Sequence, residues 1–200
     1  LGFGFAACKA LNPRLVYCAA IGYGSTGPYA GRPAYDDVIQ AASGLAGLFQ
    51  MRDGVPSFVP SIVADKVVGL HVAYAVLAAL LHRERTAGAA MLVEVPMFEA
   101  MAAFSLTEHL AAATFDRDGR PGYHRALLAT RRPYRTSDGW IAVLPYTTAH
   151  WTRVLDEFGR RDISGAAWFE DPTERSRNTD TLYAFLDAIL PGRTTAEWLE

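Results

Sequence analysis

A long apolar segment, residues 60–88, constrains the fold of this chain more than any other feature. It reads PSIVADKVVGLHVAYAVLAALLHRERTAG and predicts one long helix that ends near Gly88. Its uncharged part, Val67–Leu81, is shorter than the ~18 residues that span a bilayer, and His71 interrupts it. We therefore expect a buried core helix of a globular protein, and no interaction of the chain with a membrane.

Two polar residues, Asp65 and Lys66, stand at the start of this apolar helix. A carboxylate in the first helical turn complements the helix dipole and contributes about 0.3–1 kcal/mol, and spacing alone favours this structural role. The alternative role is a nucleophile, because a helix N-terminus favours the ionised carboxylate, which can attack a carbonyl. Lys66 is either a solvated neighbour or the partner of an anionic ligand. Position alone does not choose between these roles.

The segments before and after this helix predict an α/β layer. One buried strand is expected within residues 14–24, RLVYCAAIGYG, and another at Met91–Val95, with a helix from about Met97. Residues 35–49 carry apolar side chains at helical spacing and predict one helix. The order strand, helix, helix, strand, helix is typical of parallel strands joined by crossover helices.

The composition changes at residues 116–125, DRDGRPGYHR, which is typical of a linker or an exposed loop. Beyond it, two short strands around Ser137–Gly139 predict a hairpin, and helices are expected at 148–158 and 179–190. The sequence therefore predicts two domains. Their expected bounds are 1–112 for part of the α/β domain, 113–130 for the linker and 131–200 for part of a smaller α+β domain.

Composition and charge argue against several functions. The formal net charge is −2 and basic clusters such as Arg131-Arg132 are short, so no extended surface for nucleic acid is expected. The two cysteines, Cys8 and Cys18, lack CxxC spacing and are interpreted as buried thiols of a cytoplasmic protein. The five histidines are scattered without an HxH or HxxxH pair, so no metal site is expected.

A glycine-rich stretch, GYGSTG at Gly22–Gly27, follows the first expected strand and satisfies the pattern GxGxxG. In a dinucleotide-binding fold the third glycine opens a helix, whereas here Pro28 and Pro33 keep the chain in a loop. We therefore expect a crossing loop. Its glycines still allow backbone N–H groups to approach a thioester or phosphate oxygen.

The polar run Tyr35, Asp36 and Asp37 also has two interpretations, the start of a capped helix or polar groups that face a pocket. Adjacent residues on a helix do not face one another, so the two aspartates are not expected to form an acid/base pair. From the residues alone, the prediction is an α/β protein with a cluster of polar loops.

The sequence contains three long stretches that match one family pattern in order, residues 11–48, 59–100 and 131–151. Together they resemble the class III CoA-transferases, the family that includes formyl-CoA transferase, carnitine CoA-transferases and α-methylacyl-CoA racemase. The resemblance implies a Rossmann-like large domain, present here in part, with a smaller α+β domain. Family members are longer than this chain, which we therefore expect to be a central fragment.

The resemblance implies a role for Asp65, which occupies the place of the family's nucleophilic aspartate in VADKVVGLH. It implies that Asp65 attacks an acyl-CoA thioester, gives an aspartyl–acyl anhydride and then an aspartyl-CoA thioester, and passes CoA to a carboxylic acid. Coenzyme A thioester is then a substrate, and no permanently bound cofactor is expected. The full-length protein is expected to be a homodimer.

The family's branches differ at the position that Tyr35 occupies. Racemases carry a histidine there, as the base before an aspartate, whereas this chain reads PAYDD. Free tyrosine has a pKa of ~10, so it is poorly suited to take a proton from an α-carbon at neutral pH. The resemblance thus favours a transferase, with an acyl-CoA racemase or an inactive CoA-binding fragment as alternatives. It further implies that six residues line the acyl or CoA site: Gly22, Tyr23, Gly24, Arg32, Tyr35 and Asp36.

Overall fold

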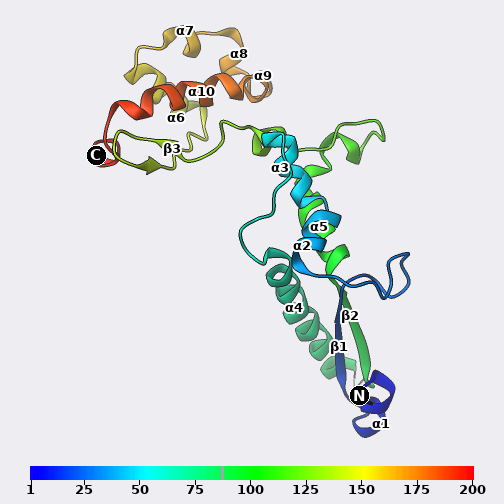
Figure 1. The fold of residues 1–200 in the computed structure, drawn as a ribbon. Helices are drawn as coiled ribbons and strands as arrows, with labels where there is room; N and C mark the ends of the chain where they lie inside the picture. The colour runs from blue at the N-terminus through cyan, green and yellow to red at the C-terminus, as the bar shows by residue number, and fades with distance from the viewer. Residues whose placement is uncertain (87) are drawn as a thin grey trace. The chain divides into compact units, whose positions relative to one another are not determined.

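The computed structural model describes residues 1–86 and 88–200 and divides into two compact units, Leu1–Tyr123 and His124–Glu200 (Figure 1). The division falls inside the segment 113–130 that the sequence marks as a linker. Each unit has its own cluster of buried hydrophobic side chains. The two units are described separately below.

The first unit contains a parallel pair of strands, β1 (Val16–Ile21) and β2 (Met91–Pro96), which lie side by side in Figure 1. Val16 is opposite Met91, and Ile21 is opposite Pro96. Parallel neighbours need a long crossover connection, and here the connection contains helices, as the sequence predicts. The α/β expectation is therefore confirmed, with a sheet of two strands in the part of the chain that is described.

In the described residues of this unit, five α-helices accompany the sheet: α1 (Phe5–Leu11), α2 (Asp36–Ala42), α3 (Leu45–Asp53), α4 (Val63–Thr86) and α5 (Met97–His109). The prediction of a single helix over 35–49 is wrong. Gly44 has a left-handed backbone with φ of 86°, which interrupts the helical path between α2 and α3. The helix α3 then continues beyond residue 49 and ends at Asp53, where Gly54 caps it with a left-handed backbone of φ 82°.

The helix α4 differs from the prediction in burial. Of its residues, Ala64, Val68 and Ala79 are buried, whereas Leu70 is 68% exposed. The expectation of a buried core helix is therefore wrong for this chain, because only one face of α4 packs on the strands and on α2 and α5. At 24 residues, with a mean hydropathy of 1.6 in its most apolar window, α4 could cross a membrane by length and composition alone. Core helices of soluble proteins share this property.

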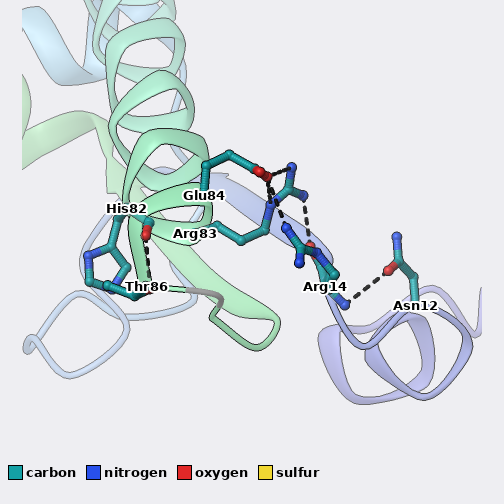
Figure 2. A network of polar contacts seen from close by, with 6 residues as sticks. All are labelled: Asn12, Arg14, His82, Arg83, Glu84 and Thr86. Atoms are coloured by element: carbon teal, nitrogen blue, oxygen red, sulfur yellow. Dashed lines mark hydrogen bonds and ion pairs between the residues drawn. The ribbon is translucent and has the colours of Figure 1, made fainter.

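The C-terminal end of α4 is tied to the chain that enters β1 (Figure 2). The Glu84 carboxylate pairs with the Arg14 guanidinium at 3.0 Å and with Arg83 at 2.9 Å, and Arg83 donates to the Arg14 carbonyl at 2.9 Å. These arginines lower the pKa of Glu84. The ion pairs are exposed, so they align the helix end with the strand more than they stabilise the fold.

The second unit is a small α+β assembly. A hairpin of β3 (Tyr134–Arg135) and β4 (Trp140–Ile141) pairs antiparallel around the predicted turn, and α6 (Thr148–Glu157) and α10 (Thr179–Ile189) match the two predicted helices. The remaining α-helices have four to six residues each, too few to show a hydrophobic period in the sequence. They are α7 (Arg161–Ser164), α8 (Ala167–Glu170), α9 (Pro172–Arg177) and α11 (Thr195–Leu199). Across both units, the described residues also form three short 3₁₀ turns: η1 (Ala111–Thr114) in the first unit, and η2 (His124–Leu127) and η3 (Leu190–Gly192) in the second.

Candidate active site

The start of α4 lacks a capping side chain of its own. The Ile62 carbonyl accepts the first helical hydrogen bond, from the Lys66 N–H at 3.2 Å, so Ile62 stands at the position where a serine, threonine or aspartate usually caps a helix. Its apolar side chain accepts no hydrogen bond. The next N–H groups, those of Ala64 and Asp65, therefore need an acceptor from elsewhere.

Asp36 on α2 supplies this acceptor. Its Oδ1 accepts from the Ala64 N–H at 2.7 Å and from the Asp65 N–H at 3.1 Å. Its Oδ2 accepts from the Gln40 side-chain amide at 2.6 Å. Asp36 is 8% exposed and Gln40 is fully buried. The Asp36 carboxylate is thus engaged on both oxygens by groups of the protein, and its predicted contact with an acyl or CoA group stays a prediction.

The Asp65 carboxylate is exposed at the same helix N-terminus. Within residues 1–86 and 88–200 it makes no hydrogen bond or ion pair, and its neighbour Lys66 donates to the Ser61 hydroxyl at 2.8 Å instead. The structure therefore separates two tasks. Asp36 satisfies the helix N–H groups, and Asp65 keeps a free carboxylate that can meet a carbonyl carbon.

Tyr35 lies beside this pair of helix starts. It precedes α2, its carbonyl accepts from the Ile39 N–H at 3.0 Å, and its side chain is 73% exposed. Asp36 follows Tyr35 directly and accepts a hydrogen bond from the Asp65 backbone N–H. The N-terminus of α2, with Tyr35 and Asp36, is therefore hydrogen-bonded to the N-terminus of α4, which carries Asp65. The structure thus brings these three predicted site residues together.

The other predicted site residues lie in the loop between β1 and α2. The Gly24 N–H donates to Glu99 Oε1 at 2.9 Å, and the Ser25 N–H donates to Glu94 Oε1 at 2.9 Å. A Cβ at Gly22 would lie 2.3 Å from the Ala34 Cβ, so close packing requires the glycine. The loop amides that were expected to approach a ligand oxygen are therefore held by two glutamates, which the sequence reasoning missed. Their acidic character within VEVPMFEA was the available signal.

Aromatic contacts order the rest of this loop. The Tyr23 ring lies 5.4 Å from the Tyr29 ring and 5.8 Å from the Phe98 ring. The Arg32 guanidinium stacks 4.8 Å from the centre of the Tyr29 ring. In the described part of the chain, no hydrogen bond or ring contact joins this loop to Asp65. The described residues also contain no cluster of three His, Cys, Asp or Glu side chains that could hold a metal ion.

Comparison with known proteins gives the family of this chain. The model of CoA-transferase family III matches residues 1–200. The chain therefore belongs to CoA-transferase family III, and the resemblance in its sequence is confirmed.

Two curated relatives illustrate the family. The chain is 34% identical over 214 residues to the probable fatty acyl-CoA transferase Rv3272 of Mycobacterium tuberculosis, covering 100% of this chain and 53% of that protein. It is 29% identical to the acetyl-CoA:oxalate CoA-transferase of Acetobacter aceti, covering 100% and 52%. A crystal structure of Rv3272 superposes with a TM-score of 0.78 at 31% identity, covering 99% of this chain and 52% of that one. The chain thus spans about half the length of the relatives it matches.

Proposed function

We propose that the complete protein transfers CoA from an acyl-CoA donor to a carboxylic acid, with Asp65 as the nucleophile. One observation carries this proposal: the Asp65 carboxylate is exposed and unpaired within the described residues while Asp36 performs the capping. A carboxylate kept only to complement the helix dipole would be redundant beside Asp36. Family membership supports the same chemistry.

The proposed reaction begins when an Asp65 oxygen bonds to the thioester carbonyl carbon and the C–S bond breaks, which gives an aspartyl–acyl anhydride and CoA thiolate. The thiolate then attacks the aspartyl carbonyl, forms an aspartyl-CoA thioester and releases the donor acid. The acceptor carboxylate attacks this thioester and expels the thiolate. The thiolate finally attacks the acceptor's carbonyl, which releases the new acyl-CoA and the free aspartate. No proton or water is consumed over the cycle.

A transferase is favoured over a racemase because Tyr35 stands where the racemases of this family carry a histidine base. An exposed tyrosine is a contact group for an acyl or CoA moiety, and we propose this role for Tyr35. The loop of Gly22, Tyr23, Gly24 and Arg32 is proposed to contact CoA at its exposed atoms. Glu99 and Glu94 hold the N–H groups of Gly24 and Ser25, so the proposed contacts with CoA fall on other atoms of the loop.

The test replaces Asp65 by Asn in the complete protein and measures CoA transfer between acyl-CoAs and carboxylic acids. Loss of turnover by at least about a thousandfold is expected, because an amide oxygen is a far weaker nucleophile than a carboxylate. Asp37→Asn, an exposed aspartate on the first turn of α2, is the matched control and should keep its activity. Wild-type turnover by the Asp65 variant would remove Asp65 from the mechanism. Deuterium uptake from solvent at the α-carbon would instead indicate the racemase reaction.

A further inference from the structure

The N-terminus of α4 receives its cap from a different helix, and this arrangement involves the backbone of the proposed nucleophile itself. We propose that Asp36 is a positioning residue for Asp65 and acts through the Asp65 backbone N–H rather than by contacting acyl-CoA. This inference rests on the proposed function of Asp65 as the nucleophile. Gln40 supports Asp36 in its positioning role.

The hydrogen bonds of Asp36 reach the two N–H groups that a local cap would serve. In a capped helix the side chain before the first turn accepts from the second or third helical N–H. Counted from Ile62, these are the groups of Ala64 and Asp65, and Asp36 Oδ1 accepts from both at 2.7 and 3.1 Å. The bond to Asp65 holds the backbone from which the nucleophile's side chain projects. A displacement of Asp36 therefore moves the reacting oxygens.

Gln40, one turn further along α2, orients the Asp36 carboxylate and the approach to α4. Its amide donates to Asp36 Oδ2 at 2.6 Å, and its carbonyl accepts from the Val59 N–H at 2.9 Å. The same amide lies 3.4 Å from the Ser61 carbonyl. One buried side chain thus connects the cap to the segment that leads into the helix. Because the cluster is buried, these bonds are stronger and less mobile than surface bonds.

This geometry leaves the Asp65 side chain without a hydrogen bond in the described residues, so its structural contribution is limited to the helix dipole. At the third helical position a longer acidic side chain can fold back to the helix start and form a capping box. In the part of the chain that the structure describes, Asp65 makes no such bond, and Asp36 takes the N–H groups in its place. The backbone of Asp65 is fixed while its carboxylate remains available, which is the arrangement that a positioned nucleophile needs.

The test compares kcat and KM for three variants of the complete protein. Asp36→Ala removes the acceptor and should lower kcat about 10- to 100-fold, because misplacement of a reacting group by about 1 Å has an effect of this size. Its KM for acyl-CoA should change less than about threefold, since Asp36 holds the nucleophile and not the ligand. Asp36→Asn combined with Gln40→Glu keeps the Oδ1 acceptor and reverses donor and acceptor between residues 36 and 40, so it should restore most of kcat. Asp37→Ala, which removes an exposed carboxylate next in the chain, is the matched control.

A raised KM with unchanged kcat in Asp36→Ala would overturn the inference and return Asp36 to the ligand site. Failure of Asp36→Asn with Gln40→Glu to restore kcat would also overturn it, since the hydrogen bonds to the α4 backbone would then not account for the effect. Should Asp36→Ala not fold, Gln40→Ala carries the test, and it should lower kcat with KM unchanged. These outcomes are separate from the test of the proposed function, which measures whether Asp65→Asn remains active.

Discussion

At the scale of single residues, the neighbours decide what each of the two aspartates can do. Asp36 on α2 is buried and accepts hydrogen bonds from the α4 backbone and from Gln40, whereas Asp65 on the first turn of α4 is exposed. The sequence indicated that Asp65 lies in the first helical turn, because the uncharged apolar run begins two residues after it, at Val67. It could not indicate the role of Asp36, since the cap depends on two segments that are distant in the chain.

The close packing around Gly22 leads to a prediction for stability. A Cβ at this position would lie 2.3 Å from the Ala34 Cβ, whose place is set by its backbone. We expect Gly22→Ala to lower the free energy of unfolding of the complete protein by about 1–3 kcal/mol. Denaturant titration measures the change.

Gly27→Ala is the matched control in the same loop, because its nearest new contact would be at 3.5 Å, an ordinary distance. It should change the unfolding free energy by no more than about 0.5 kcal/mol. Equal effects of the two substitutions would show that the contact with Ala34 does not restrict residue 22.

At the scale of elements, sequence patterns predicted what local contacts determine. The two parallel strands, the start of α5 and the helices α6 and α10 follow apolar periodicity and turn residues, and the structure has them. The division of α2 from α3 was missed because Gly44 lies inside an unbroken helical pattern, and only its positive φ interrupts it. The exposure of α4 was missed because composition measures how apolar a helix is and not how many neighbours it has.

The hairpin strand β3 gives a pH prediction, because Tyr134 is 2% exposed and packs in the core of the second unit. Burial, helped by Tyr183 and Asp187, raises the pKa of Tyr134 from 10 to about 12. Above pH 10 the unfolded chain loses this proton while the folded chain retains it. The stability that Tyr134 contributes through its proton is therefore present in full below pH 10 and is lost as the pH rises toward about 12.

The expected slope from this group is at most about 1.4 kcal/mol of unfolding free energy per pH unit in that window. Denaturant titrations of the complete protein at several alkaline pH values measure it. Tyr134→Phe should show a shallower alkaline decline than the wild type, whereas Tyr146→Phe, at an exposed position, should follow the wild type. Parallel curves for Tyr134→Phe and the wild type would contradict the assignment.

At the scale of the whole molecule, the chain belongs to CoA-transferase family III and spans about half the length of its relatives. Within this half, the first unit holds Asp65 together with Tyr35 and Asp36, and the second unit has a separate core. The family could be predicted from the sequence because three long stretches match its pattern in order. The donor and the acceptor acid follow no residue code in these stretches, so binding measurements on the complete protein must identify them.

The most direct test of the central claim is to map the covalent intermediate on the complete protein. The protein is exposed briefly to a panel of acyl-CoAs and treated with hydroxylamine, which attacks the aspartyl carbonyl and releases the acid or CoA. Peptide mass spectrometry then locates the hydroxamate. We predict a hydroxamate at Asp65 with acyl-CoAs that the enzyme uses, and none in Asp65→Asn. A hydroxamate at another residue, or turnover without any hydroxamate, would contradict the role of Asp65 as the nucleophile.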